Sequence, residues 1–205
     1  MILRPLADAI PTTQPFAFVS ATGLLTPADL EAIAADFPDI ADPGLFPLSA
    51  LTYGPAFGRL VEALRSPAFA ALVGEKLGLA LADLPLMITV RGRCAARDGR
   101  AHTDSKDKVA TGLLYLNGSE WTGQGGRLRL LRSRDLSDVL AEIPPVGGSL
   151  VAFRRTDASW HGHEPFEGER RYLMFNWVRS APALGRNVAR HRLSAAFKRI
   201  AAHVV

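Results

Sequence analysis

Apolar residues recur at helical spacing in the first third of the chain. Between Thr26 and Phe37, the apolar side chains Leu30 and Ile33 follow the three-to-four-residue spacing of one helix face. Thr26 is a favourable N-cap residue, and Pro27 suits the first helical position. A later segment begins with a serine and a proline and ends near a glycine, which predicts a further helix. The expected helices cover residues 26–37, 58–64 and 66–77, after an extended lead-in over residues 1–15 and a strand over residues 16–19.

The pattern changes near residue 86. Short runs rich in β-branched and aromatic residues alternate with turns such as Gly125-Gly126 and Pro144-Pro145, which is typical of a β-sandwich or barrel. Helical spacing returns in the tail at 190–203. The strands are expected over residues 86–90, 109–116, 127–131, 148–153 and 171–178. We therefore predict one domain over residues 1–205, with a helical support region over 1–85, a β core over 86–178 and a C-terminal helix over 179–205.

Composition narrows the class of protein. The chain has 205 residues, of which 48% are hydrophobic and 21% charged, so a folded single domain is expected rather than a disordered chain. The most apolar stretch, residues 68–90, is interrupted by charged residues and Pro85, so no membrane span is expected. The N-terminus lacks the apolar run of a secretory signal. A single cysteine, Cys94, excludes an internal disulfide and a multi-cysteine zinc site. We expect a cytoplasmic protein.

The net charge of +4 permits anionic partners but does not require nucleic acid, which is not an expected partner. The basic residues are concentrated in two stretches. They are either solvated charges at strand edges or a rim that attracts an anionic substrate. The two stretches contain Arg91, Arg93, Arg97, Arg100, Lys106 and Lys108, and then Arg127, Arg129, Arg132 and Arg134.

The candidate chemistry begins at His102-Thr-Asp104. Side chains two residues apart in a strand point to the same face, so His102 and Asp104 can face one cavity. A histidine from a neighbouring strand would complete a facial triad of two histidines and one carboxylate. Such a triad binds non-haem Fe(II) and leaves three positions open. Alone, a His-x-Asp sequence can equally be a hydrogen-bonded pair on a surface loop, but a second histidine-rich block follows at 159–177.

Together, these motifs resemble the 2-oxoglutarate/Fe(II)-dependent dioxygenases, in particular the prolyl-4-hydroxylase-like branch. The resemblance covers roughly residues 86–178, and several motifs in order make it more specific than any one of them. It implies a double-stranded β-helix, a jelly-roll, cupin-like barrel with flanking N-terminal helices and a C-terminal helix. The motifs are His102-Thr-Asp104, Tyr115-Leu-Asn117, Gly125-Gly126 with Leu128, Pro145-x-x-Gly-Ser-Leu-Val-Ala-Phe153, and the block 159–177.

The resemblance implies roles for five side chains. His102, Asp104 and His161 correspond to the Fe(II) ligands. Arg171 corresponds to the cation that binds the distal carboxylate of 2-oxoglutarate, because arginine offers a planar fork for a carboxylate. Tyr115 stands where the family often places a hydroxyl donor to the same carboxylate.

Two assignments have alternatives. His163 could replace His161 as the metal ligand. We prefer His161, because Pro165 and Arg171 then follow the ligand at the family's offsets of four and ten residues. Arg170 could replace Arg171. Strand alternation groups Arg171 with three apolar residues that include Trp177, so we expect Arg171 and Trp177 to face the cavity and Arg170 to face outward.

The implied activity is an oxygenase that consumes 2-oxoglutarate and O2 and releases succinate and CO2, with ascorbate as a candidate reductant. We expect a hydroxylase acting on a C–H bond of a peptidyl, prolyl-like or small-molecule substrate. The alternative is a non-catalytic or sensing metal-binding jelly roll. Nucleic-acid dealkylation is disfavoured because that branch has a second arginine where this chain has Trp177. Hydrolysis at Ser159 lacks a Gly-x-Ser-x-Gly turn. The sequence does not predict the oligomeric state.

Overall fold

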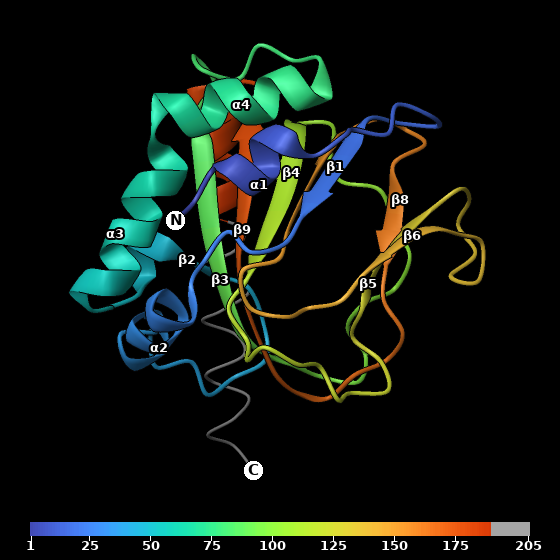
Figure 1. Ribbon diagram of the computed structural model, residues 1–205. Coiled ribbons are helices and arrows are strands. Elements are labelled where there is room, and N and C mark those ends of the chain that lie inside the picture. Colours follow the sequence, from blue (N-terminus) through green and yellow to red (C-terminus); the bar gives the residue numbers. More distant parts are fainter. Residues whose placement is uncertain (190–205) are drawn as a thin grey trace.

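The computed structural model describes residues 1–189 and shows a mainly β protein with flanking helices (Figure 1). Within these residues the strands form two antiparallel sheets, of order β1-β7-β4-β9-β3-β2 and β6-β5-β8. The two sheets face one another as a jelly roll, as predicted. The strands are β1 (Phe18–Ala21), β2 (Phe46–Pro47), β3 (Leu86–Cys94), β4 (Lys108–Tyr115), β5 (Leu128–Leu131), β6 (Val139–Ile143), β7 (Leu150–Arg154), β8 (Trp160–Gly162) and β9 (Gly168–Val178).

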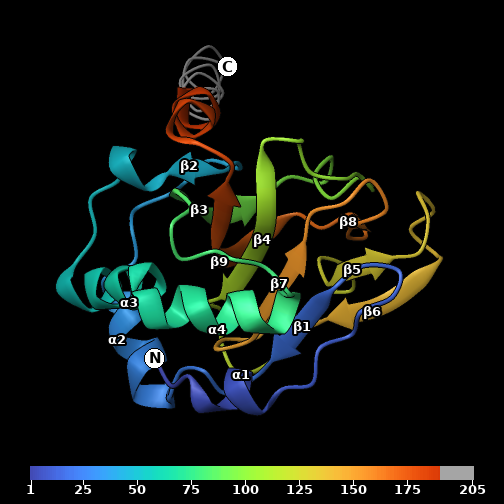
Figure 2. The same cartoon turned by 90° about the horizontal axis from the view of Figure 1, so that it is seen from above.

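The helices cover the outer face of the larger sheet (Figure 2). The side chain of Phe69 packs there against Phe175 and Trp177, at ring-centroid distances of 5.3 and 6.0 Å. Thr26 forms the predicted cap, since its hydroxyl accepts the Asp29 backbone N–H. The helices are α1 (Arg4–Asp8), α2 (Pro27–Ala35), the 3-10 turn η1 (Leu48–Ala50), α3 (Pro55–Arg65) and α4 (Pro67–Leu77), and residues 181–189 are also helical.

Strand β9 separates two apolar clusters. Leu173, Phe175 and Trp177 belong to the cluster under the helices, whereas Tyr172 belongs to the cluster between the two sheets. The face shared by Arg171 and Trp177 is therefore the outer face of the sheet. The predictions that Arg171 and Trp177 face the cavity are wrong. The alternation was correct, but the apolar face of β9 packs against helices, and the face that carries polar residues lines the barrel.

Several elements differ from the sequence-based expectation. Helix α1 lies within the lead-in that we expected to be extended, and strands β2, β6 and β8 were not predicted. Strand β1 lies near the strand expected over residues 16–19, and both β1 and the unpredicted β2 join the larger sheet. The helical tail expected at 190–203 lies outside the described residues. No helix within residues 1–189 is long and apolar enough to cross a membrane.

Candidate metal centre and anion site

A two-residue β-bridge brings the two candidate histidines together. The backbone N–H of His102 donates to the carbonyl of His161 at 3.0 Å, and the reciprocal bond is also 3.0 Å. The imidazole centroids lie 4.3 Å apart. The backbone of β8 also lies so close to the segment before His102 that position 162 must be a glycine, because a Cβ on Gly162 would lie 2.6 Å from the carbonyl oxygen of Gly99. The bridge thus joins β8 of the smaller sheet to the segment before β4.

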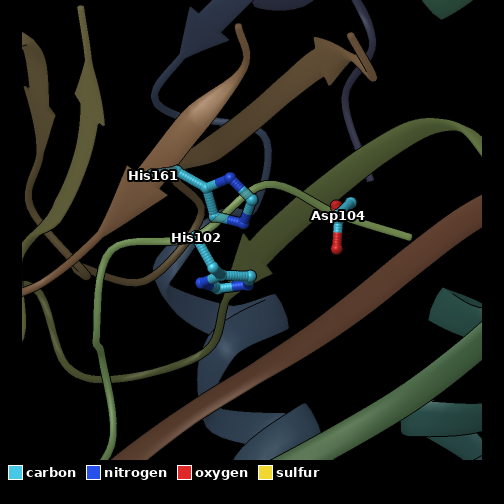
Figure 3. Close-up of side chains that lie close together, drawn as sticks. All are labelled: His102, Asp104 and His161. Atoms are coloured by element: carbon cyan, nitrogen blue, oxygen red, sulfur yellow. The ribbon is translucent and has the colours of Figure 1, made fainter. Parts of the chain in front are cut away.

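Asp104 completes the cluster (Figure 3). One potential ligand atom from each of His102, Asp104 and His161 lies within 4.8 Å of the other two. Asp104 and His161 are buried, whereas His102 is exposed, so the site opens to solvent beside His102. His102 and Asp104 lie in a loop with one isolated bridge, whereas strand geometry was assumed when we expected both side chains to face one cavity.

The hydrogen bonds of both imidazoles suit metal binding. Nδ1 of His102 lies 2.9 Å from the carbonyl oxygen of Arg100, and Nδ1 of His161 lies 3.0 Å from that of Ser159. Because a carbonyl can only accept, each Nδ1 carries the hydrogen and each Nε2 keeps a lone pair for a metal. Burial lowers the pKa of His161 to about 4, so this imidazole is neutral at pH 7, as a ligand must be.

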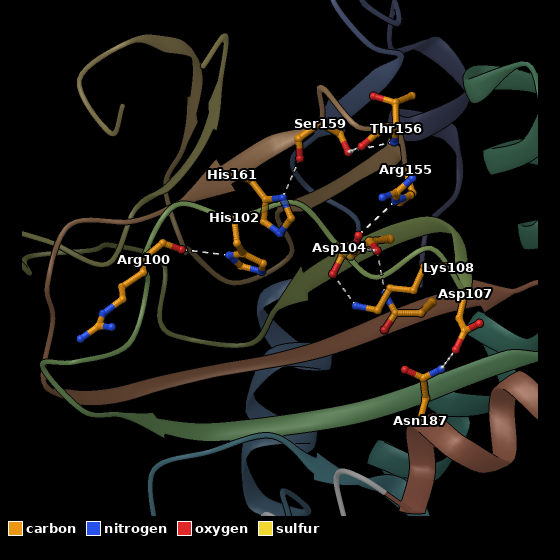
Figure 4. Close-up of polar contacts among 12 residues, drawn as sticks. Arg100, His102, Asp104, Asp107, Lys108, Arg155, Thr156, Ser159, His161 and Asn187 are labelled. Atoms are coloured by element: carbon orange, nitrogen blue, oxygen red, sulfur yellow. Dashed lines mark hydrogen bonds and ion pairs between the residues drawn. The ribbon is translucent and has the colours of Figure 1, made fainter. Parts of the chain in front are cut away.

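A polar network holds Asp104 (Figure 4). Nζ of Lys108 donates to one carboxylate oxygen at 2.6 Å, and Oγ1 of Thr111 donates to the other at 2.5 Å. The amide of Asn176 in turn donates to Oγ1 of Thr111. Burial would raise the pKa of Asp104, but Lys108 and these hydrogen bonds lower it below its usual range. Asp104 is therefore an ionised, oriented carboxylate.

Arg170 is the arginine that lies inside the barrel. Its side chain is 1% exposed, with Nε donating to the carbonyl of Gly126 and Nη2 donating to the hydroxyl of Tyr115 at 3.0 Å. Arg171 instead pairs with Glu169 at the surface and lies over the ring of Phe37. The arginine inside the barrel is therefore Arg170, nine residues after His161, and the predicted Arg171, ten residues after it, lies outside the barrel.

The Arg170–Tyr115 pair suits an anionic ligand. Two of the five guanidinium N–H groups bind the described protein atoms, which leaves three donors for a carboxylate. Burial raises the pKa of Tyr115 to about 12, so its hydroxyl keeps the proton that it can donate. Buried arginines are expected to be paired, yet no carboxylate within residues 1–189 forms an ion pair with Arg170.

Unpartnered polar atoms also line the barrel. Oγ1 of Thr89, Nε of Arg91 and Oδ1 of Asn176 are buried without a hydrogen-bond partner among residues 1–189. Their strand neighbours pack under the helices, so strand alternation places these three side chains on the inner face. Such atoms are rare in folded proteins unless a ligand or water completes them. The hydroxyl of Thr89 and the Nε–H of Arg91 could each donate to an anion such as 2-oxoglutarate, whereas Oδ1 of Asn176 can only accept and would need a donor such as water.

Sequence reasoning missed Lys108, Thr111 and Asn176, the residues that support Asp104. The sequence did contain a signal for Asn176, because this polar residue stands between Phe175 and Trp177 of the apolar face of β9 and therefore points to the opposite face. His163, which we weighed as a ligand, lies outside the three-residue cluster. Its Nδ1 lies 2.8 Å from the carbonyl oxygen of Glu164, and burial, followed by Arg170, lowers its pKa to about 4.

The two basic stretches are partly neutralised within the protein. Several basic side chains near the His102 loop remain exposed and could attract an anion. That the substrate is anionic is still a prediction. Acidic residues pair with Arg91, Lys108, Arg127, Arg129 and Arg132, whereas Arg93, Arg97, Arg100, Lys106 and Arg134 are exposed.

Residues 93–179 match the family model described as the 2OG-Fe(II) oxygenase superfamily. No curated protein matches the sequence. Among solved structures, a Pseudomonas putida prolyl-4-hydroxylase is similar with a TM-score of 0.56 and 19% identity, covering 86% of this chain and 98% of that chain. The viral collagen prolyl hydroxylase vCPH from Paramecium Bursaria Chlorella virus-1, in a 2OG complex, has a TM-score of 0.53 and 16% identity, covering 80% and 96%.

HygX from Streptomyces hygroscopicus, with nickel and 2-oxoglutarate bound, has a TM-score of 0.54 and 14% identity, covering 81% of this chain and 84% of that chain. At these identities the structural similarity establishes the fold, and the family match covers the β core. The resemblance predicted from the motifs is therefore confirmed: residues 93–179 match the model of the 2OG-Fe(II) oxygenase superfamily, and the fold is similar to that of the two prolyl hydroxylases.

Proposed function

We propose that the chain is an Fe(II)- and 2-oxoglutarate-dependent oxygenase that hydroxylates a C–H bond and releases succinate and CO2. The observation that carries the proposal is the convergence of His102, Asp104 and His161 within 4.8 Å. Both imidazoles offer Nε2, and the carboxylate is ionised. This donor set is that of the Fe(II) facial triad, which leaves three coordination positions open.

Each part of the site has a role in this proposal. His102, Asp104 and His161 would hold Fe(II), which supplies the activation of O2 when it is bound. The guanidinium of Arg170 and the hydroxyl of Tyr115 would bind the distal carboxylate of 2-oxoglutarate and so set its orientation. The apolar cluster between the sheets, which includes Phe153 beside His161, would exclude water.

The proposed substrate is a peptidyl, prolyl-like residue or a small molecule that enters beside the exposed His102. The two prolyl hydroxylases among the similar structures support the peptidyl class. The exposed arginines near the His102 loop would favour an anionic substrate. Ascorbate is proposed as a reductant that keeps the iron ferrous.

Succinate release tests the proposal directly. The chain is loaded with Fe(II) under anaerobic conditions, and 2-oxoglutarate and O2 are then added, with and without proline-containing peptides. We expect succinate from the wild type and none above background from Asp104→Ala or His102→Ala, because each variant lacks one metal ligand. Asp83→Ala, which removes an exposed carboxylate before β3, serves as the control and should retain activity.

The result that would contradict this function is a wild-type chain that binds iron and 2-oxoglutarate but releases no succinate under any of these conditions. That outcome would favour the alternative of a non-catalytic or sensing metal-binding jelly roll.

A further inference from the structure

Lys108 is a buried cation beside the candidate metal centre. It is the first residue of β4, its side chain is 7% exposed, and its Nζ lies 2.6 Å from Oδ1 of Asp104, whose side chain is 8% exposed. Lysine is almost never buried unless it is paired. The pair therefore places a positive charge next to the carboxylate that would bind a divalent cation (Figure 4).

Other contacts orient Asp104 independently of Lys108. Oγ1 of Thr111 donates to Oδ2 at 2.5 Å, and Asn176 fixes Thr111 through a 2.8 Å hydrogen bond. Nε of Arg155 donates to the backbone carbonyl of Asp104 at 3.0 Å. Because these three residues restrain both the side chain and the backbone, the distinct contribution of Lys108 is its charge.

We propose that Lys108 is a built-in counter-cation: it neutralises Asp104 in the metal-free protein and lowers the affinity of the His102–Asp104–His161 site for divalent cations. The inference rests on the metal site of the proposed function, and not on the oxygenase reaction. It adds a residue that tunes how tightly the metal is held.

Removing the charge of Lys108 should have two effects of opposite sign. A divalent cation bound to Asp104 would be repelled by the Lys108 ammonium, and such repulsion is weakly screened in a buried site. Removing the lysine charge should therefore tighten metal binding. In the metal-free protein the same change leaves the Asp104 carboxylate buried without its counter-charge, which should lower stability.

The test compares Lys108→Met, which keeps a similar length and removes the charge, with Lys106→Met, which removes an exposed lysine two residues before β4. Co(II) is titrated into each metal-free protein and followed by calorimetry and by its visible absorbance. We expect the Co(II) dissociation constant to fall by about tenfold or more in Lys108→Met and to stay unchanged in Lys106→Met.

Thermal unfolding provides the second readout. Metal-free Lys108→Met should unfold at a lower temperature than the wild type, and saturating Co(II) should raise its midpoint by more than it raises that of the wild type. Lys108→Gln, which retains a hydrogen-bond donor without the charge, should show the same direction and replaces the Met variant if that variant does not fold.

Equal or weaker Co(II) binding by the Lys108 variants would overturn the inference and make Lys108 a residue that only orients Asp104. In that case the proposed function would stand, provided that the wild type binds Co(II). A wild-type chain that binds no Co(II) would instead overturn both the inference and the metal centre.

Discussion

Arg170 and Arg171 are neighbours in the chain whose side chains have opposite surroundings. Arg170 is buried against Tyr115 and Gly126, whereas Arg171 pairs with the exposed Glu169. A carboxylate that binds Arg170 exchanges water for charge-assisted hydrogen bonds inside the barrel, but one that meets Arg171 would stay in water. The difference between the two arginines is therefore one of position in the fold.

This difference predicts unequal effects of two matched variants. Arg170→Met should weaken 2-oxoglutarate binding by about 1.5–3 kcal/mol, the usual contribution of a hydrogen bond to a charged group. Arg171→Met should leave the affinity nearly unchanged. The measurement is a titration of 2-oxoglutarate into each Co(II)-loaded protein.

Equal losses in the two variants would contradict the assignment of Arg170 as the cosubstrate residue. A larger loss in Arg171→Met would restore the assignment that the family's ten-residue offset implied.

At the scale of elements, the two faces of β9 have different functions. Leu173, Phe175 and Trp177 attach the sheet to the helices, and the alternate residues line the barrel. The sequence shows this alternation plainly. Which face is inside depends on the helices, because α4 supplies Phe69 as the apolar partner of Phe175 and Trp177.

Trp177 should accordingly affect stability and not cosubstrate binding. Trp177→Ala removes a fully buried ring and should lower the free energy of unfolding by about 3–5 kcal/mol, as measured by urea denaturation. Trp177→Phe should cost less, because most of the packing area is retained.

In the folded Trp177→Phe variant, the affinity for 2-oxoglutarate should equal that of the wild type. A variant with normal stability and weakened 2-oxoglutarate binding would show that Trp177 lines the cavity after all.

The elements that the sequence did not predict are short or irregular. Strands β2 and β8 have two and three residues, which is too short for an alternation to be recognised. Helix α1 has five residues. Strands β2 and β8 are held by pairing with β3 and β5, which lie far away in the chain, so local propensity carries little information about them.

At the scale of the whole molecule, the candidate metal centre joins the two sheets. His161 belongs to β8 of the smaller sheet, and Asp104 lies just before β4 of the larger one. A metal bound by both would act as a cross-link between the sheets. The metal finds its three ligands together only in the folded chain, so metal binding stabilises the folded state over the unfolded state.

We therefore expect Co(II) at about one hundred times its dissociation constant to stabilise the wild type by roughly 2.7 kcal/mol. The measurement is urea unfolding with and without Co(II). Asp104→Ala should lose this stabilisation, and Asp83→Ala should retain it. Equal stabilisation of all three proteins would indicate that Co(II) binds elsewhere.

Local patterns in the sequence were enough to predict the helices at 26–37 and 66–77 and the strands β3, β4, β5, β7 and β9, because caps and periodicity are properties of short segments. The histidine–carboxylate cluster was predicted from the family resemblance of several ordered motifs. The choice of Arg170, and the presence of Lys108, Thr111 and Asn176 around Asp104, depended on the tertiary structure. The reason is that strand alternation defines two faces without saying which one is covered. Burial against the helices, and the charge that a buried carboxylate requires, arise when distant segments pack together.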